Sequence, residues 1–591
     1  MAAFDFRLLS FIGIKETPKA PWSKNYKKSM MKIHLNDESF YDYLKNKSLK
    51  NGYGPNVAIS YYGNKITYNE LFHNISLYAK KFLSLGVRKY DIVTIISANI
   101  PEAIFAVYAL NKIGAVANML HPLLSKNEIK NALNEYNSKV VLTMDIMAEK
   151  VASIINETNV EKVIIASPSS YMNIFLKGLY KFKNFKEHYR KYFKNNFITI
   201  DDFLKLKHSN NIYISKALKD DPALILQSGG STGTPKGIVL SNGNINASTI
   251  SALNSCEDLS QNDKALGIMP IFHGFGLAVS INDVLCVGAE VVLVPAFKAD
   301  RFHKLLIKHN PTILIGVPTL YEALTTNSEM EKVDLSQLNY VISGGDTLSK
   351  DRVEKINEFL AEHGAKTKMI QGYGLTEAVA AASMDRKDST KPGTIGIPWP
   401  GVYIGIFEVG GEKQLPYDTD GEICVCGPTV MLGYYNNEAE TNKALRYHKD
   451  GNIWLHTGDI GSMDKEGYIT YKQRIKRMIV SSGYNVYPSQ IEEVLRQHEA
   501  VLNTLVIGIP HKYKGEVAKA FIVLKKGYKK SDKLKNEIET LCKDNLAHYA
   551  VPKEYEFINS LPKTVVGKVD FMKLQEKEKL KEIKNEKKQK S

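Results

Sequence analysis

Between residues 91 and 166 the sequence alternates between short apolar runs and segments with helical periodicity. The apolar runs of strand length are residues 92–97, 115–120, 140–143 and 162–166. The segments with a helical pattern are 101–112, which begins with proline, and 126–136. Proline is favoured at the first position of a helix because its missing N–H would have no partner there. This alternation predicts α/β units built around a parallel sheet.

The length and composition exclude several classes of protein. A chain of 591 residues is expected to form more than one domain. With 44% hydrophobic and 24% charged residues it is neither collagen, nor a mucin-like stalk, nor disordered throughout. Lys and Arg exceed Asp and Glu by 78 − 63 = 15. That balance suits an anionic partner, although a solvated lysine-rich surface gives the same count.

The cysteines and the apolar stretches indicate the compartment. Five cysteines in so long a chain do not predict a disulfide framework, so we expect a reducing, cytoplasmic location. Cys424 and Cys426 would share one face of a strand, and without a second pair at zinc spacing we expect them in the core. The sequence has no run of eighteen uninterrupted apolar residues, so we expect no membrane-spanning helix. The apolar stretch 8–14 is short and is preceded by Asp5 and Arg7 instead of a basic n-region, so no signal peptide is expected.

Two further segments differ from the rest. Residues 169–195 interleave aromatic side chains with lysines, a pattern typical of an interfacial amphipathic segment. The alternatives are a plain surface insertion, peripheral contact with a membrane or with entering fatty acid, and nucleic-acid binding. We expect no nucleic-acid partner, because no binding module is present. Residues 573–591 are rich in Lys and Glu and predict a frayed helix or a disordered tail.

The strongest chemical signal is the ten-residue run 228–237, SGGSTGTPKG, between two apolar strands. Its four glycines and four hydroxyl residues expose backbone N–H groups that can surround phosphate oxygens. Lys236 adds a positive charge. The run is no Walker loop, because Lys236 is followed by Gly237 and a strand, not by Ser or Thr and a helix.

The run resembles the phosphate-binding signature of the adenylate-forming superfamily, which includes acyl- and aryl-CoA synthetases. Four more segments match that family in its own order: residues 371–377 (QGYGLTE), 457–459 (TGD), Arg474 with 483–492 (GYNVYPSQIE), and 562–568 (PKTVVGK). The resemblance covers roughly residues 40 to 575. In its details the chain is similar to bacterial fatty acyl-CoA ligases. The resemblance implies an α/β fold with a large N-terminal domain of parallel sheets and a small, mobile α+β C-terminal domain.

The resemblance implies a role for each matching residue. ATP phosphates would be bound by Ser228, Gly229, Gly230, Ser231, Thr232, Gly233, Thr234 and Lys236. Adenine and ribose would be bound by Gly344, Gly345, Asp346, Gln371, Gly372, Tyr373, Gly374, Asp459 and Arg474. Glu377 would hold Mg²⁺, a hard cation that prefers carboxylate oxygens. Thr376 would contact the α-phosphate, and Lys568 would bridge that phosphate and the substrate carboxylate.

The same resemblance describes the acyl site and the motion between half-reactions. His273 would lie beside the carboxylate that is activated. Amino-acid-activating relatives place an acid shortly after Phe272, where this chain has His273, and a buried ammonium without a counter-charge is costly. A plain carboxylic acid is therefore expected. Lys476 would be the hinge of a rotating small domain that presents Ser482, Gly483 and Tyr484 to CoA.

The predicted domains are 1–475 for AMP binding and adenylation, 476–575 for the small domain, and 576–591 for a basic tail. The expected activity is ATP- and Mg²⁺-dependent formation of acyl-AMP from a fatty acid, followed by thioester formation with CoA. The alternatives left open are transfer to an acyl carrier protein, an aryl acid as substrate, and a catalytically silent nucleotide- or lipid-binding protein. The intact set of Lys236, Glu377, Asp459 and Lys568 argues against the last.

Overall fold

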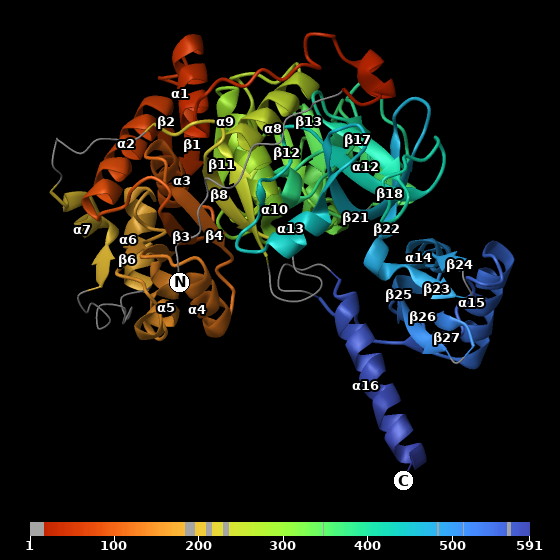
Figure 1. Ribbon diagram of the computed structural model, residues 1–591. Helices are drawn as coiled ribbons and strands as arrows, with labels where there is room; N and C mark the ends of the chain where they lie inside the picture. Colours follow the sequence, from red (N-terminus) through yellow and green to blue (C-terminus); the bar gives the residue numbers. More distant parts are fainter. Residues whose placement is uncertain are drawn as a thin grey trace.

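The computed structural model describes residues 17–183, 196–207, 216–228, 236–346, 348–481, 484–511, 513–563 and 569–590. Within these residues the strands form four sheets, three in a large N-terminal body and one in a small C-terminal body (Figure 1). The expected α/β architecture with a small α+β domain is confirmed.

The first sheet contains the alternation of strands and helices that the sequence predicts. It is parallel from β8 to β7, with β9 and β19 antiparallel at one edge. Across the sheet the strands are β19 (Gly433–Tyr434), β9 (Gly237–Ser241), β8 (Pro222–Gln227), β4 (Val116–Leu120), β3 (Ile92–Ile96), β5 (Val140–Met144), β6 (Lys162–Ala166) and β7 (Phe197–Thr199).

The second sheet has a parallel centre with antiparallel strands at both edges. Its strands in order are β16 (Ile397–Pro398), β15 (Ser383–Met384), β14 (Met369–Tyr373), β13 (Tyr340–Ser343), β12 (Ile313–Gly316), β10 (Lys264–Gly267), β11 (Glu290–Leu293), β1 (Val57–Tyr61) and β2 (Asn64–Thr67).

Helices of the large body begin at clear sequence signals. Thr67 with Glu70, Ser125 with Glu128 and Ser241 with Asn244 form capping boxes that satisfy the first N–H groups of α2, α4 and α8. The large body contains α1 (Phe40–Asn51), α2 (Tyr68–Ser84), α3 (Pro101–Lys112), α4 (Lys126–Glu135), α5 (Ala148–Ala152), α6 (Ile174–Lys183), α7 (Ile200–Lys205), α8 (Asn242–Ser255), a π-helix (Phe275–Asp283) that continues into α9 (Val284–Cys286), α10 (Phe302–His309), α11 (Pro318–Thr326), α12 (Lys350–Glu362) and α13 (Glu438–Ala444).

A third, antiparallel sheet follows in the chain and leads to the small body. Its strands are β17 (Tyr403–Phe407), β18 (Gly421–Cys426), β20 (Leu445–Tyr447), β21 (Ile453–Met463) and β22 (Ile469–Arg474). Cys424 and Cys426 are buried in β18, as expected for core residues, and the thiols of all five cysteines are free.

The small body has a sheet and a core of its own. Its strands are β23 (Ile479–Ser481), β24 (Tyr484–Val486), β25 (Val501–His511), β26 (Gly515–Leu524) and β27 (Glu554–Phe557), and its helices are α14 (Pro488–Arg496), α15 (Asp532–Asn545) and α16 (Phe571–Lys590). Among the described residues, the main core of the large body ends at Ile469 and that of the small body begins at Ile479.

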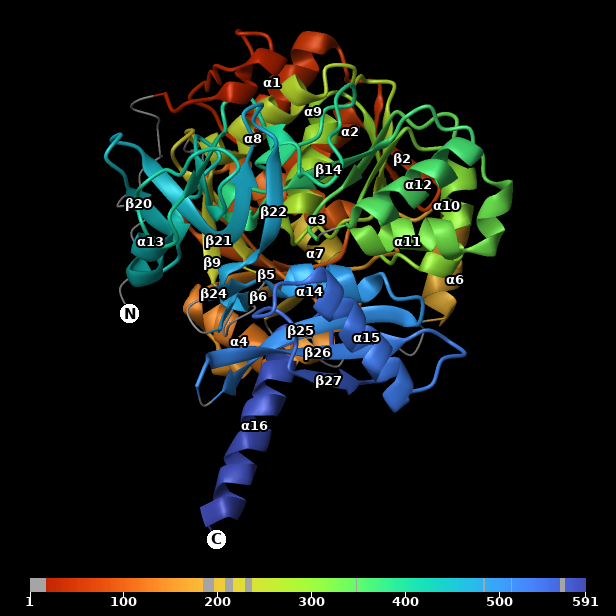
Figure 2. The same cartoon turned by 90° about the vertical axis from the view of Figure 1, so that its right-hand side faces the viewer.

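Helix α16 gives the predicted tail a regular backbone, and Figures 1 and 2 show it projecting away from both bodies. Its first turns are anchored. Leu574 is buried against residues of β25 and β26. The Glu578 carboxylate lies 2.8 Å from the Nζ atom of the buried Lys519, which also contacts Glu554 and Glu556 at 3.0 and 3.1 Å. The base of α16 is therefore fixed to the small sheet.

Candidate active site

Asp459 and Arg474 lie directly opposite each other in the antiparallel pair β21 and β22. The Arg474 Nε atom is 2.9 Å from Asp459 Oδ1, and the Tyr373 hydroxyl donates to Asp459 Oδ2 at 2.7 Å. Burial raises the pKa of Asp459, and Arg474 opposes that rise. Burial and the neighbouring Asp459 hold the pKa of Tyr373 well above its usual value. The three residues predicted to face the nucleoside thus form one network.

The other predicted nucleoside residues lie at the ends of neighbouring parallel strands. Gly344, Gly345 and Asp346 follow β13, and Gln371 to Gly374 include the end of β14. A Cβ atom on Gly344 would lie 3.3 Å from the Gly372 carbonyl oxygen. Gly345 has φ = +80°, a conformation that glycine adopts without strain. Ligands of open α/β sheets bind at this carboxyl edge.

The ends of the predicted phosphate loop are held together. The Ser228 amide donates to the Lys236 carbonyl at 2.8 Å, and the Lys236 amide donates to Ser228 Oγ at 2.9 Å. Gln227 and Gly237 pair across the hairpin of β8 and β9. The predicted residues between these ends, Gly229 to Thr234, lie outside the described residues, so the structure supports a closed loop base and nothing further.

Lys236 lies among side chains from distant parts of the chain. Its Nζ atom pairs with the Glu440 carboxylate of α13 and lies 4.7 Å from the centre of the Tyr434 ring. The Tyr434 hydroxyl donates to Glu377 Oε1 at 3.0 Å. The hydrogen bond from Lys236 lowers the pKa of Glu440 to about 2. Lys236 and the predicted Mg²⁺ ligand are therefore linked through one tyrosine.

Glu377 lies in a strained turn. Thr376–Ala378 form a short 3₁₀ segment, and Val379 follows with φ = +67° and ψ = −63°. The Ala380 amide donates to the Ala378 carbonyl at 2.9 Å, which closes a γ-turn of the rare strained kind. A β-branched residue rarely adopts a positive φ, so the surrounding structure must impose it.

Two glycines allow this turn to pack against its neighbours. A Cβ atom on Gly374 would lie 1.7 Å from the Ala380 carbonyl oxygen, and one on Gly274 would lie 2.0 Å from the Val379 carbonyl oxygen. Gly274 follows His273, whose amide donates to the Pro270 carbonyl at 3.0 Å. The predicted acyl-site histidine thus lies on a segment that contacts the strained turn.

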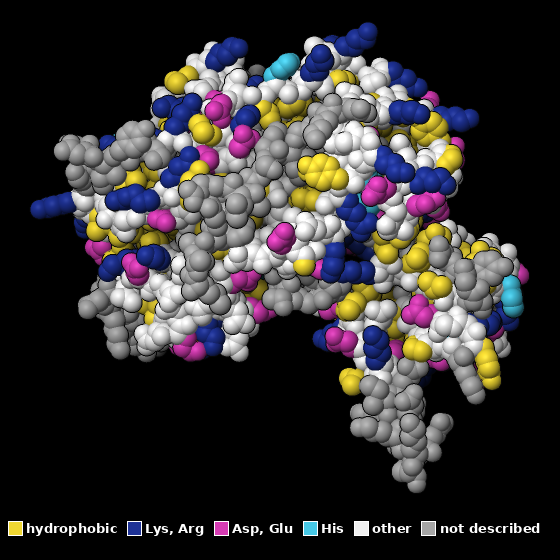
Figure 3. All heavy atoms as spheres, viewed as in Figure 1, with side chains coloured by type: hydrophobic (Ala, Val, Ile, Leu, Met, Phe, Trp, Pro, Cys, Tyr) yellow, Lys and Arg dark blue, Asp and Glu magenta, His cyan; other side chains and the backbone are white. Residues whose placement is uncertain are grey.

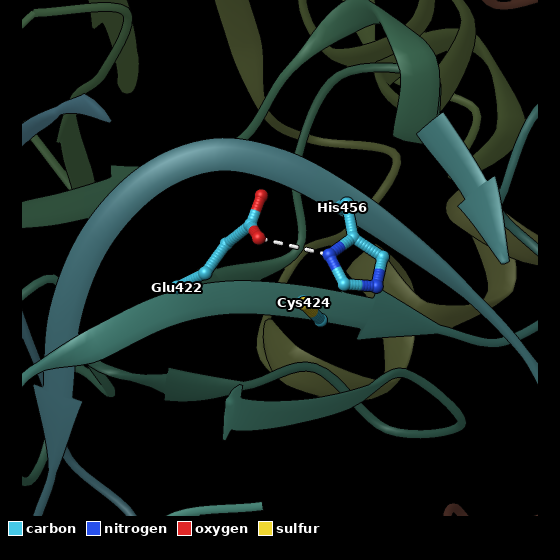
Figure 4. A group of neighbouring side chains, drawn as sticks. All are labelled: Glu422, Cys424 and His456. Carbon is cyan, nitrogen blue, oxygen red and sulfur yellow. Dashed lines mark hydrogen bonds and ion pairs between the residues drawn. The ribbon is translucent and has the colours of Figure 1, made fainter. Parts of the chain in front are cut away.

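Support for the Thr457–Asp459 motif comes from a buried cluster in the third sheet (Figure 4). The Glu422 carboxylate lies 2.8 Å from His456 Nδ1 and accepts from the Gly458 amide at 3.1 Å. His456 Nε2 is 3.0 Å from His448 Nε2. Ligand atoms of Glu422, Cys424 and His456 lie within 4.8 Å of one another. Because Glu422 and His456 already bond to each other and to the backbone or His448, we interpret the cluster as support for Asp459.

The predicted hinge lies between two anchored arginines. Arg474 is held by Asp459 of the large body, whereas Arg477 pairs with Glu492 of α14 in the small body. Only Ile475 and Lys476 lie between them. Burial, and next the neighbouring Lys236, lower the pKa of Lys476. Lys476 therefore lies close enough to Lys236 for the two charges to interact.

Four of the predicted site residues involve segments that the structure does not describe in full. Lys568, Ser482, Gly483 and the side chain of Tyr484 lie outside the described residues. The described residues on the two sides of the segment that carries Lys568 contact each other. Lys563 pairs with Val569, and the Asp570 amide donates to the Pro562 carbonyl at 2.9 Å.

Sequence reasoning missed Tyr434, Glu440 and Glu422. No local pattern marks Tyr434, because only the pairing of β19 with β9 brings it beside Lys236. A surface hollow of about 480 Å³, lined by residues such as Tyr53, Cys256 and Cys286, contains none of the predicted site residues.

Comparison with known proteins gives consistent matches. Residues 49–435 match the model of the AMP-binding enzyme family, and residues 490–568 match the AMP-binding enzyme C-terminal domain. A Long-chain-fatty-acid–CoA ligase of Bacillus subtilis is 35% identical over 88% of this chain and 92% of its own length. One of Salmonella typhimurium is 29% identical over 82% and 85%.

Solved structures match over nearly the whole chain. The ATP-bound MatB of Rhodopseudomonas palustris superposes with a TM-score of 0.79, at 25% identity, over 92% of this chain and 99% of its own. The family-model match alone spans more than half of the 591 residues. The chain belongs to the AMP-binding enzyme family.

Proposed function

We propose that this protein is an AMP-forming acyl-CoA synthetase that activates a long-chain fatty acid. A fatty carboxylate would attack the α-phosphorus of ATP, giving acyl-AMP and releasing pyrophosphate. The CoA thiol would then attack the acyl carbon, forming the thioester and releasing AMP. The relatives named long-chain-fatty-acid–CoA ligase support the substrate class, and the site supports the nucleotide chemistry.

The observation that carries the proposal is the convergence of charged groups from separate segments. Lys236, Arg474 and Lys476 supply cations, and Glu377 and Asp459 supply carboxylates, within a region where their charges affect one another. Two anions, a carboxylate and a triphosphate, must approach each other in the first step. Preorganised cations and hydrogen-bond donors lower the cost of that approach.

Each residue has a role in this proposal. Asp459 would accept from the ribose hydroxyls, held by Arg474 and Tyr373. Gly344, Gly345, Asp346 and the Gln371–Gly374 segment would enclose adenine. The glycine-rich residues between Ser228 and Lys236 would present backbone N–H groups to the β- and γ-phosphates. Thr376 would donate to the α-phosphate, and His273 would lie beside the acyl carboxylate.

Glu377 fits a magnesium ligand in its chemistry. It is a half-buried carboxylate, one oxygen of which is oriented by the Tyr434 hydroxyl. Carboxylate oxygens together with substrate phosphates are the usual ligands of Mg²⁺. The ion would neutralise phosphate charge, while Tyr434 and the fixed turn at Thr376–Ala378 keep Glu377 in position.

The hinge would separate the two half-reactions. We assign residues 1–475 to the adenylation domain, 476–575 to the small domain and 576–591 to a basic tail, with Lys476 as the pivot. Arg474 stays with the large body and Arg477 with the small body, so rotation would be absorbed at Ile475 and Lys476. The motion would withdraw Lys568 and bring Ser482, Gly483 and Tyr484 to CoA.

AMP release with CoA tests the assignment across acids from acetate to palmitate, with benzoate as the aryl alternative. We expect the highest kcat/KM for long-chain acids, and preference for benzoate would overturn the substrate class. Lys568→Ala should abolish acyl-AMP formation and spare thioester formation from preformed acyl-AMP, whereas Lys563→Ala, at the other end of the same loop, should keep both. Glu377→Ala should lose Mg²⁺-dependent pyrophosphate release.

The site of action follows from the substrate. No helix in the described part of the chain is long and apolar enough to cross a bilayer. Long acyl chains partition into membranes because each buried CH₂ contributes about 0.8 kcal/mol. We therefore infer that a cytoplasmic enzyme of this kind meets its substrate at a membrane surface.

A further inference from the structure

Helix α6 turns its apolar side toward solvent. Ile174, Phe175 and Leu179 are 91%, 71% and 51% exposed, and Gly178 between them is also exposed. Positions i, i+1, i+4 and i+5 lie on one side of a helix. A surface helix normally buries that side, so α6 has the opposite orientation.

Polar contacts hold the inner side of the helix. The Tyr180 hydroxyl lies 3.3 and 3.4 Å from the two carboxylate oxygens of Asp145. Lys177 Nζ donates to the Ser170 carbonyl at 3.3 Å. The helix is therefore attached through its polar residues, and Ile174, Phe175 and Leu179 stay exposed.

The exposed apolar surface extends beyond the helix. Ile146, 64% exposed, follows the Asp145 that binds Tyr180, and Tyr62, 39% exposed, carries the carbonyl that accepts from the Asn173 amide at 3.5 Å. We call the group formed by Tyr62, Ile146, Ile174, Phe175 and Leu179 the α6 patch. Clustered exposed apolar side chains of this kind mark an interaction surface.

The sequence around the patch is basic. Helix α6 has three lysines, at positions 177, 181 and 183, and no acidic residue. In sequence, residues 169–195 hold six lysines and Arg190 against one acid, Glu187. Figure 3 shows Lys and Arg side chains spread over the visible face of the large body. An apolar surface flanked by lysines is complementary to anionic lipid head groups above hydrocarbon.

We propose that the α6 patch docks on an anionic lipid bilayer. The helix lies in the plane of the interface, with Ile174, Phe175 and Leu179 inserted among the acyl chains. A second copy of the chain is the less favourable occupant, because a twofold contact would bring two lysine-rich segments together. The role of the docking, access to membrane-dissolved fatty acid, rests on the proposed function, whereas the docking itself does not.

The test is co-sedimentation of the full-length protein with phosphatidylcholine vesicles that contain or lack phosphatidylglycerol. We expect binding to the anionic vesicles that weakens as salt is raised. The triple variant Ile174→Ser, Phe175→Ser, Leu179→Ser should bind about tenfold more weakly or worse, because its apolar side chains no longer enter hydrocarbon. Pyrophosphate exchange with a short, soluble acid should stay at the level of the unaltered protein.

A matched control replaces three apolar residues of similar exposure on other elements. Leu49, Ile307 and Leu502, on α1, α10 and β25, are 69%, 61% and 55% exposed. The triple serine variant at these positions should bind vesicles as the unaltered protein does. The proposal fails if the unaltered protein does not bind anionic vesicles, or if the α6 variant binds them as tightly as the control variant does. It also fails if the α6 changes abolish only a dimer seen by sedimentation velocity.

Discussion

The guanidinium carbon of Arg477 lies 5.7 Å from the centre of the Phe571 ring. Arg477 also pairs with Glu492, and Phe571 is the first residue of α16, three positions after Lys568. The side chain of Asp570 accepts from the Lys573 amide at 3.2 Å and so caps the same helix. Arg477 therefore connects the proposed hinge with the segment that carries the proposed catalytic lysine.

We expect Arg477→Gln to slow the adenylation half-reaction selectively. A cation–π contact is worth about 0.5–2 kcal/mol, and its loss should loosen the base of α16 and lower the rate of pyrophosphate exchange about tenfold. Thioester formation from preformed acyl-AMP should change by less than about twofold, since that step does not use Lys568. Arg352→Gln, which breaks an exposed pair with Glu322, is the control. Equal losses in both half-reactions would contradict the connection.

Tyr373→Phe should weaken ATP binding with little effect on turnover. The variant loses the hydroxyl that donates to Asp459 at 2.7 Å. A hydrogen bond to a charged group contributes about 1.5–3 kcal/mol, so the KM for ATP should rise roughly tenfold or more. Tyr471→Phe is the matched control, because the Tyr471 ring lies 6.1 Å from that of Tyr373. Removing the Tyr471 hydroxyl leaves the bond from Tyr373 to Asp459 intact. An unchanged KM for ATP would remove Asp459 from nucleotide binding.

The strained turn at Val379 predicts a reversal of the usual preference between alanine and glycine. Glycine adopts φ = +67° without the cost of about 1–3 kcal/mol that a sparsely populated backbone conformation imposes on other residues. Val379→Gly should therefore unfold at a higher urea concentration than Val379→Ala, although it buries one methyl group less. The same comparison at Ala106, inside α3, should favour alanine. If alanine is also the more stable at 379, the turn has another conformation in solution.

Glu102 should make the stability fall as pH rises. Its side chain is fully buried at the start of α3, and burial raises its pKa to about 7. Between about pH 4.5 and 7 the folded protein holds this proton while the unfolded chain releases it, so unfolding becomes easier as pH increases.

Above pH 7 the raised pKa of Glu102 lowers the free energy of unfolding by about 3 kcal/mol, compared with its value below pH 4.5. Glu102→Gln, which keeps the shape without the charge, should raise the melting temperature more at pH 8.5 than at pH 5.5. Burial also raises the pKa of Asp283 and Asp385 to about 7, so the informative quantity is the difference between variant and unaltered protein. An equal effect at both pH values would show that Glu102 does not titrate between them.

Local patterns predicted the first sheet well. The helix expected at 101–112 is α3 with the same limits, and the strand expected at 162–166 is β6. Both have continuous apolar runs and clear start signals, and these depend only on neighbouring residues. The two apolar strands expected on either side of the glycine loop are β8 and β9, whose antiparallel pairing the sequence did not reveal.

Contacts between distant segments could not be predicted in this way. Lys236 and Glu440 are 204 positions apart, and Tyr434 reaches them only because β19 pairs with β9. Glu422 and His456 meet through the pairing of β18 with β21, which no spacing rule reveals. The positive φ of Val379 is imposed by packing, since its side chain alone would favour the opposite.

Two anchored arginines with two residues between them have a practical consequence for handling this protein. Trypsin cleaves after lysine and arginine, and three such bonds follow Arg474, Lys476 and Arg477. Cleavage at any of these bonds should yield two fragments, each keeping its own hydrophobic interior. A nucleotide that slows the nicking would report, without any activity assay, that the connection stiffens when the site is filled.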